Sequence, residues 1–403
     1  MAWIDALFRR MVQLGASDLH MTSNVQPMFR LHGDMQPVEG CPVLTPEQML
    51  PILWEVAPER NRAEYESSND TDFAYELEGV ARFRANIFRD HRGPGAVFRQ
   101  IPSKILTAEE LKLPRAVVDF CQLSKGLVLV TGPTGSGKST TLAAMVDHIN
   151  KTRSEHIITI EDPIEFVHQN QRCLVNQREV HAHTGSFKRA LRAALREDPD
   201  IVLVGEMRDL ETIEIAIETA ETGHLVFGTL HTSTAATTVD RIIDQFPADR
   251  QAQIRTMLAS SLKGVVAQTL CKKTGGGRVA ALEILVVNSA IASNIREGKT
   301  HQIASLMQMG AKTGSRLLND SLIELVKSGQ VDVDQAYLKS IQKDDFVKKC
   351  QSEGIRIAAR TEDEGAPRGP LPAATHAEAQ PTQTTNTTRS AGGFDDFRRQ
   401  RST

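Results

Sequence analysis

The sequence predicts an α/β protein whose larger part contains a mostly parallel, buried sheet. Four short and fully apolar runs, separated by helical segments, support this prediction. They lie at residues 127–130, 157–160, 201–204 and 225–227. A glycine-rich loop at 132–139 directly follows the first run and opens a helix, which is the setting of a phosphate-binding loop.

Composition narrows the class of protein. The chain has 403 residues, enough for two domains with separate cores, and its formal net charge of −3 argues against a nucleic-acid binder with a broadly basic surface. The five cysteines include no C-x-x-C pair, so we expect neither a disulfide framework nor a zinc knuckle. Scattered cysteines of this kind are typical of a reduced, cytoplasmic compartment. Charges interrupt the first ten residues, and no apolar run reaches 18 residues. We therefore expect neither an export signal nor insertion into a membrane.

Changes in pattern along the chain predict four regions. Residues 1–100 are expected to form a mixed α and β domain, and 101–122 a linker with a helix. The apolar runs assign 123–352 to the parallel-sheet domain with C-terminal helices. Residues 353–403 are rich in Pro, Thr, Ala, Gln and Gly, a composition that cannot bury a core, and are expected to be a disordered tail.

Local signals predict several elements of the first region. Apolar residues from Trp3 to Met11 recur at helical spacing, and Gly15 is expected to end that helix. A second helix is expected to start at 45–48, and a third, capped one at Thr107. Alternating residues predict an antiparallel hairpin of strands 81–88 and 95–101, across a turn that contains 93–95.

The glycine-rich loop carries the most specific chemistry in the sequence. Its glycines allow backbone N–H groups to point at phosphate oxygens, and the helix that follows adds positive partial charge. Lys138 is expected to reach the β- and γ-phosphates, and the Ser139 hydroxyl to bind Mg²⁺. The expected binding residues for ATP are Gly132, Pro133, Thr134, Gly135, Ser136, Gly137, Lys138 and Ser139.

Acidic residues follow two other apolar runs. Glu206 comes after the run at 201–204, with Gly205 in the position of the usual metal-side aspartate, and is expected to serve the nucleotide and its Mg²⁺. The acids of 159–165 could orient or deprotonate a water, although solvated turn residues would look the same. His224 and His231 match no zinc spacing, so hydrogen-bonding roles toward the nucleotide or the core are expected.

Taken together, these motifs resemble the secretion-ATPase superfamily, and most closely its branch that retracts type IV pili. The resemblance covers roughly residues 1–345 and rests on five blocks in one order, with further likeness at 15–20 and 241–247. The five blocks are 132–140, 160–166, 196–200, 204–209 and 222–232.

The resemblance implies a homohexamer of chains, each with a PAS-like N-terminal domain and a RecA-like ATPase domain. It also implies ATP hydrolysis coupled to pilus retraction and twitching motility. By that likeness Glu165 is the catalytic carboxylate and Glu206 the Walker B acid, with Thr140 beside the phosphate loop. His224 and His231 correspond to the family's His box. Arg84 and Arg99 correspond to arginines that reach phosphates when the ring closes.

The implied partners are other copies of the chain, the inner-membrane platform protein of the pilus and possibly an accessory retraction ATPase, at the inner face of the cytoplasmic membrane. At 290–297 and 314–317 the sequence differs from the family's C-terminal signature. By the resemblance, these differences concern pilus retraction and leave ATP hydrolysis unaffected. Three alternatives stay open: the accessory retraction homologue itself, a RecA-type nucleic-acid motor, and a regulatory nucleotide-binding subunit with little turnover.

Overall fold

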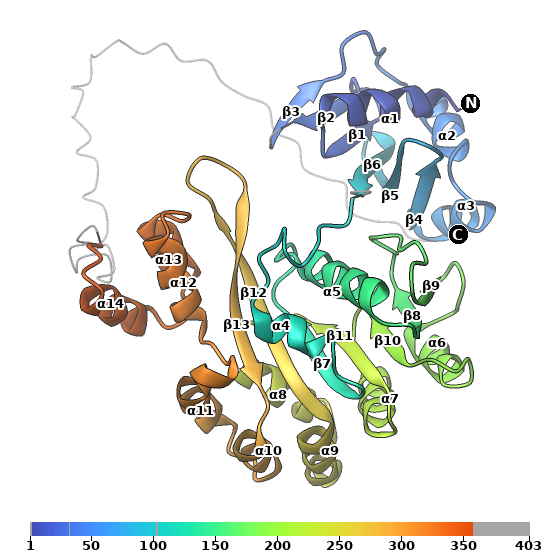
Figure 1. Cartoon of the computed structure of the whole chain (residues 1–403). Helices are drawn as coiled ribbons and strands as arrows, with labels where there is room; N and C mark the ends of the chain where they lie inside the picture. Colours follow the sequence, from blue (N-terminus) through green and yellow to red (C-terminus); the bar gives the residue numbers. More distant parts are fainter. Residues whose placement is uncertain (1, 32, 102–103, 358–403) are drawn as a thin grey trace, which may run out of the picture. The chain divides into compact units, whose positions relative to one another are not determined.

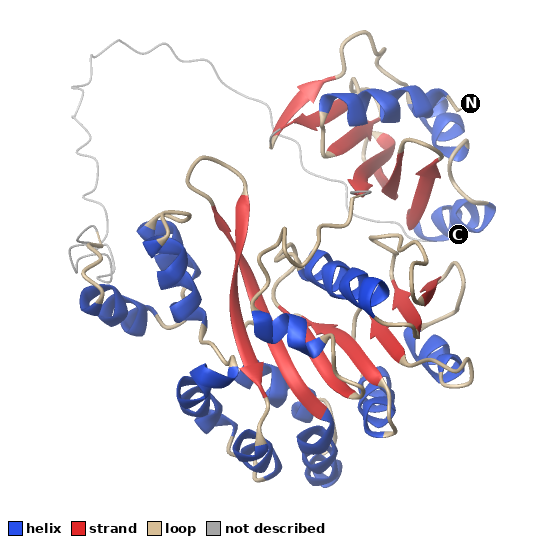
Figure 2. Cartoon of the chain, viewed as in Figure 1, coloured by secondary structure: helices blue, strands red, loops and turns tan. Residues whose placement is uncertain are grey.

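The computed structural model describes residues 2–31, 33–101 and 104–357, and two β-sheets organise them (Figures 1 and 2). The predicted disordered tail falls outside these residues from position 358 onward. Residues 353–357 are the part of the predicted tail that the structure describes, and they directly follow the last helix, which ends at Ser352. Within the described ranges, no helix combines the length and the apolar character needed to cross a bilayer.

The N-terminal region folds around a six-stranded antiparallel sheet with strand order β3-β2-β1-β6-β5-β4. Phe8 occupies the centre of its core, with ring centroids 4.2 Å from Phe83 and 5.0 Å from Phe98. The elements of this region are α1 (Trp3–Leu14), β1 (Asp18–Thr22), β2 (Met28–Leu31), β3 (Asp34–Pro37), α2 (Pro46–Trp54), α3 (Glu59–Ser68), β4 (Asp70–Leu77), β5 (Ala81–Asp90) and β6 (Gly93–Ile101).

Most of the predicted N-terminal elements are present. Helix α1 ends at Gly15, whose positive φ of 68° suits glycine, and α2 begins after a capping box at Thr45. Strands β5 and β6 form the expected hairpin. The predicted turn was wrong by two residues: Gly93 and Pro94 pair within β6, and the chain reverses just before them.

The helix predicted at Thr107 was also wrong. Thr107 and Glu110 make the expected reciprocal cap, with N···O distances of 2.8 and 3.1 Å. Only a turn forms after this cap, because Pro114 lies just beyond and disfavours helical backbone at the preceding residue. The helix of this linker is instead α4 (Arg115–Phe120).

The larger sheet has seven strands in the order β13-β12-β7-β11-β10-β8-β9. Every neighbouring pair is parallel except β12 with β13, which form an antiparallel hairpin. All four predicted apolar strands are confirmed within it. The strands are β7 (Gly126–Thr131), β8 (His156–Glu161), β9 (Leu174–Glu179), β10 (Ile201–Val204), β11 (Leu225–Leu230), β12 (Leu262–Lys272) and β13 (Arg278–Val286).

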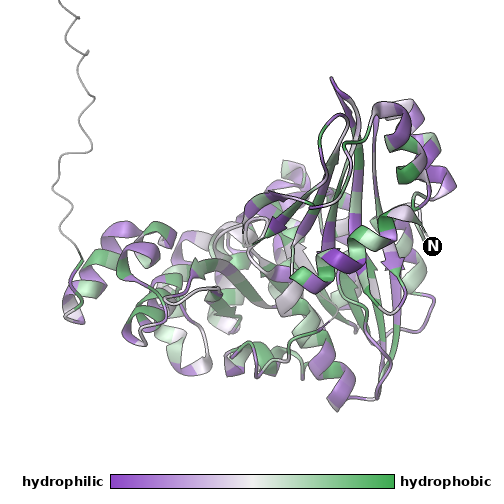
Figure 3. Ribbon diagram, turned by 90° about the horizontal axis from the view of Figure 1, so that it is seen from above, coloured by the Kyte–Doolittle hydropathy of each residue, from purple (hydrophilic) through white to green (hydrophobic). Residues whose placement is uncertain are grey.

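Helices cover both faces of this sheet, so alternate residues of its strands enter two separate cores (Figure 1). One face packs against α4 and α5 (Lys138–Thr152). The other packs against α6 (Phe187–Ala194), α7 (Leu210–Glu221), α8 (Ala235–Asp244), α9 (Ala248–Ser261), α10 (Ser289–Arg296) and α11 (Ile303–Met309). Several helices carry hydrophobic and hydrophilic residues on different sides (Figure 3), as packing on one face requires. Among those on this sheet, α6, α8 and α10 do so clearly.

A C-terminal group of helices adjoins the hairpin of β12 and β13. It contains α12 (Leu318–Lys327), α13 (Val333–Lys339) and α14 (Lys343–Ser352), preceded by the short 3₁₀ segments η1 (Thr300–Gln302) and η2 (Gly310–Thr313). Its core is apolar and includes Leu322, Phe346 and Cys350, all fully buried.

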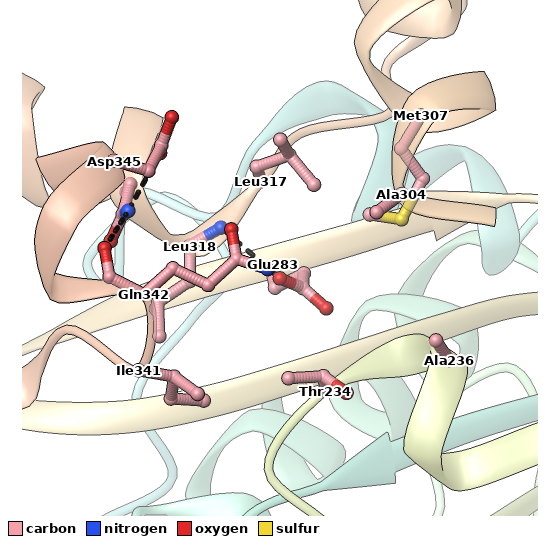
Figure 4. A pocket seen from close by; sticks show the side chains of 11 residues that line it. Thr234, Ala236, Glu283, Ala304, Met307, Leu317, Leu318, Ile341, Gln342 and Asp345 are labelled. Carbon is pink, nitrogen blue, oxygen red and sulfur yellow. Dashed lines mark hydrogen bonds between the residues drawn. The ribbon is translucent and has the colours of Figure 1, made fainter. Parts of the chain in front are cut away.

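A cavity of about 90 Å³ separates α8 and α11 from this C-terminal group (Figure 4). The buried carboxylate of Glu283 lies at its wall and accepts hydrogen bonds from the backbone N–H groups of Ala235, at 2.8 Å, and Leu318, at 3.3 Å. These residues are the first of α8 and α12, so one carboxylate caps two helices. Burial raises the pKa of Glu283, and its backbone contacts oppose that rise.

Acidification is expected to destabilise the fold through His168, in the segment between β8 and β9. Its Nδ1 is buried with no hydrogen-bond partner among the described residues, and burial lowers its pKa to about 4. Between pH 6.5 and 4 the unfolded chain binds a proton that the folded chain does not, so stability present above pH 6.5 is lost as the pH falls. From pH 7 to 5, wild type should lose up to about 2 kcal/mol more unfolding free energy than His168→Gln. Urea unfolding of both proteins at the two pH values measures this difference; equal losses would contradict it.

Candidate functional site

The phosphate-binding loop connects β7 to α5 along a tightly packed path. A Cβ at position 132 would lie 2.3 Å from the carbonyl oxygen of Gln268 and 2.6 Å from Ser136 Oγ, so only glycine fits there. Gly137 has φ of 90° and directly precedes α5. Among the residues that the structure describes, no side chain caps that helix, which leaves the N–H groups of its first turn available to an anion.

Lys138 lies at the centre of the charged groups of this region. Its ammonium donates hydrogen bonds to the carbonyls of Gly132, at 2.9 Å, and Pro133, at 3.4 Å. Burial lowers the pKa of Lys138, while the charges of Glu206 and Glu165 act in the opposite direction. The structure therefore brings the predicted loop lysine and both predicted acids into one electrostatic neighbourhood.

Glu206 follows β10 and is held from two sides. Its Oε1 lies 2.5 Å from Arg208 Nε and 2.9 Å from His231 Nε2. Burial opposes ionisation, but Arg208 and then His231 bring the net pKa of Glu206 below its usual value. The preceding residue, Gly205, donates to the Ile160 carbonyl at 2.7 Å, and a Cβ there would lie 3.0 Å from that same oxygen. This close approach accounts for a glycine where an aspartate is usual.

The acidic segment after β8 is braced by Glu161. Its carboxylate accepts hydrogen bonds from the Thr159 hydroxyl, at 2.6 Å, and the Gln177 amide, at 3.2 Å, and also from the backbone of Glu165. Burial raises the pKa of Glu161. Glu165 itself is exposed, and within the described ranges no ion pair or side-chain hydrogen bond occupies its carboxylate. Glu161 thus holds the segment in place, and the carboxylate of Glu165 is available to bind a water or accept a proton.

The two histidines flank β11 at opposite ends, about 20 Å apart along an extended strand. His231 is at the carboxyl end, beside Glu206. His224 is at the amino end, where its carbonyl accepts from Gly126 N at 3.0 Å and its Nδ1 lies 3.1 Å from the Thr219 carbonyl oxygen. The structure does not bring His224 to the phosphate-binding loop of its own chain.

Arg84 and Arg99 are direct cross-strand partners on β5 and β6, so their side chains leave the same face of the N-terminal sheet. Each pairs with an acid of that sheet: Arg84 Nε lies 3.8 Å from Asp72 Oδ1, and Arg99 Nε lies 2.8 Å from Asp18 Oδ1. The Arg99 side chain is nevertheless 70% exposed. These pairings keep both guanidinium groups at the surface and do not join them to the phosphate-binding loop.

Two side-chain oxygen atoms at this edge of the sheet are suited to coordinate a hard divalent cation. The Ser139 hydroxyl, in the first turn of α5, makes no hydrogen bond with any residue that the structure describes. Both side-chain contacts of Glu206 use Oε1, which leaves Oε2 able to accept or coordinate. Hydroxyl and carboxylate oxygens of this kind are what magnesium prefers.

Sequence reasoning gave no role to three residues that shape the site: Arg208, Glu161 and Gln268. Arg208 stands two positions after Glu206, so the block at 204–209 could have suggested an ion pair. Glu161 was included among the acids without a separate function. Gln268 lies 132 residues from the loop carbonyl that it contacts, and no local pattern connects the two.

The segment at 290–297 forms α10, away from the phosphate-binding loop. Ile291 and Ile295 are fully buried, as their spacing predicts, and Arg296 is exposed. The Asn294 amide donates to the Gln302 side-chain oxygen at 3.3 Å. The two buried isoleucines therefore anchor this helix on the core, and the half-buried Ala292 packs beside them.

Comparison with known proteins agrees with this geometry. Residues 1–338 match the family described as "Type II/IV secretion system protein". The "Type IV pilus retractation ATPase PilT" of Pseudomonas aeruginosa is 53% identical over 332 residues, covering 82% of this chain and 96% of the relative. The "Type IV pilus ATPase PilU" of the same organism is 40% identical, covering 82% and 87%.

A solved structure described as "Crystal Structure of the Pilus Retraction Motor PilT and Bound ADP" superposes with a TM-score of 0.81. It is 46% identical in sequence, and the match covers 86% of this chain and 99% of the other. Both the sequence and the fold thus agree over nearly the whole length of these relatives. This chain belongs to the type II/IV secretion system protein family, among the relatives of its type IV pilus retraction ATPases.

Proposed function

We propose that this protein hydrolyses ATP and uses the energy to retract type IV pili. The observation that carries the proposal is a loop whose tightly packed glycine and open helix N-terminus fit phosphate. Lys138 lies in this loop, and Glu165 and Glu206 are near enough for their charges to act on its pKa. Pilus retraction as the work that hydrolysis drives is inferred from the similarity to pilus retraction ATPases over most of the chain. The greater identity to PilT than to PilU favours the principal retraction motor over the accessory homologue.

In this proposal the site works by positioning and by electrostatics. The loop N–H groups and Lys138 hold the phosphates and stabilise charge that develops between the β- and γ-phosphates. Ser139 and Glu206 would hold Mg²⁺, which supplies further charge neutralisation. Glu165, whose carboxylate is free, accepts the proton of the attacking water. His231 fixes the orientation of Glu206 through their 2.9 Å contact.

We further propose that the working form is a hexameric ring of chains with PAS-like N-terminal domains, at the cytoplasmic face of the inner membrane beside the pilus platform protein. The exposure of Arg99 supports this arrangement, because a guanidinium at the surface can reach a nucleotide held by another copy. His224 can serve a nucleotide only through such a neighbour. The net charge of −3 does not favour the alternative of a nucleic-acid motor.

Lys138→Ala tests the whole function. The variant should lack detectable ATP hydrolysis, because no cation then neutralises the charge between the phosphates. It should also fail to restore twitching in cells that lack their own retraction ATPase, whereas the wild-type chain restores it. Turnover close to wild type would contradict the site, and wild-type chain that hydrolyses ATP without restoring twitching would contradict only the output.

Glu165→Gln and Glu206→Gln are expected to bind ATP and to turn it over about 10²- to 10⁴-fold more slowly. Each replacement keeps the shape of the side chain and removes its charge. Equilibrium binding of a fluorescent ATP analogue, alongside steady-state hydrolysis, separates affinity from turnover. Glu353→Gln, which alters an exposed acid paired with Lys327 and outside the five family blocks, is the matched control. Normal turnover in both site variants would contradict their roles.

Arg99→Ala tests whether sites are completed by neighbouring chains. The variant should bind nucleotide normally and lose turnover by about 10³-fold, as expected when an arginine that neutralises transition-state charge is removed. Mixing it with Lys138→Ala protein should restore part of the activity, because mixed rings contain some complete sites. Sedimentation of a fully active monomer would rule out this arrangement.

A further inference from the structure

Gln268 is a buried amide behind the phosphate-binding loop, on a strand to which the proposed mechanism gives no part. It lies on β12, one residue beyond the last pair between β12 and β7, Ala267 with Thr131. The whole residue is only 2% exposed. Its backbone is fixed on the other side by pairing with Leu282 of β13. A buried amide on a rigid strand costs stability unless both of its ends are hydrogen-bonded.

Both ends of this amide are used, and both contacts are with the loop or the helix that follows it. Gln268 Nε2 donates to the carbonyl oxygen of Ser136 at 2.7 Å, and Gln268 Oε1 accepts from the Thr141 hydroxyl at 2.9 Å. The Ser136 carbonyl can only accept, so the NH₂ end of the amide must face it. Ser136 and Thr141 are themselves only 3% and 4% exposed, so both contacts lie away from bulk solvent.

The contact with Ser136 has a consequence on the opposite side of the loop. Among the described residues only Asp162–Pro163 is a cis peptide bond, so the bond from Ser136 to Gly137 is trans. In a planar trans peptide the C=O and the following N–H point in opposite directions. Holding the Ser136 carbonyl against β12 therefore turns the Gly137 N–H away from the sheet, toward the concave side of the loop. Gly137, with φ of 90° and no Cβ, offers little resistance to the reverse rotation.

We infer that Gln268 is a positioning residue for nucleotide binding, which fixes the Ser136–Gly137 peptide so that the Gly137 N–H faces the phosphates. The inference rests on the proposed function, because it assumes that the loop holds a nucleoside di- or triphosphate. ATP and ADP both carry the phosphates that such a loop cradles, so affinity for both should depend on Gln268. The residue touches no reacting atom, and turnover at saturating ATP should change less than affinity.

The test compares full-length wild type with Gln268→Met and Gln268→Leu, two apolar replacements of similar size that cannot donate. Thr141→Val is the matched control: it removes the other hydrogen bond of the same amide and leaves the contact with Ser136. For each protein, a fluorescent ADP analogue with Mg²⁺ gives the dissociation constant, steady-state ATP hydrolysis gives KM and kcat, and thermal unfolding gives Tm.

The dissociation constant for the ADP analogue should rise about 10- to 100-fold in either Gln268 variant, the range expected for losing a hydrogen bond to a charged group. KM for ATP should rise with it and exceed the change in kcat, while Thr141→Val lowers Tm and keeps near wild-type affinity. Unchanged affinity in a folded Gln268 variant would overturn the inference. So would an equal loss of affinity in Thr141→Val, since general loosening of the loop would then explain both. A wild-type chain that binds neither nucleotide would contradict the proposed function instead.

Discussion

The parallel direction of six strands is the constraint on which the rest of this structure depends. Parallel strands leave a sheet at the same edge, so the segments that follow β7, β8, β10 and β11 all emerge together. Those segments supply the phosphate-binding loop, Glu165, Glu206 and His231. Residues that are far apart in sequence become neighbours without any special folding of the loops. The same rule removes His224 from the site, because it precedes β11 instead of following it.

Close approach of backbones is the second requirement, and it selects glycine at defined positions. Gly132 lies against the carbonyl of Gln268, and Gly205 against that of Ile160. In both places a side chain would push a strand end away from its neighbour. The Thr229 hydroxyl donates to the Gly205 carbonyl and ties the end of β10 to β11. Positioning of Glu206 thus depends on atoms that a survey of charged residues would overlook.

How much the sequence could predict depends on the range of each signal. The apolar strands and the phosphate-binding loop were predictable because each depends on neighbouring residues alone. The helix predicted after Thr107 does not form. Its local cap is present, but Pro114 disfavours helical backbone at the residue before it, so only a turn follows the cap. Gln268 and Glu283 could not be predicted for another reason. Each is a buried polar residue in a largely apolar strand, and its partners lie 35 to 132 residues away. Only the pairing of β12 with β7 and β13 reveals which groups they contact.

Glu283 also connects the surroundings of the nucleotide site to the C-terminal helices. His231 contacts Glu206, and Thr232, the next residue, has its hydroxyl 2.7 Å from that of Thr238 in α8. The first N–H of α8 then bonds to Glu283, which also holds the start of α12. A continuous series of hydrogen-bonded elements therefore leads from Glu206 to the C-terminal helices. The departures from the family at 290–297 lie on α10, which has no part in this series.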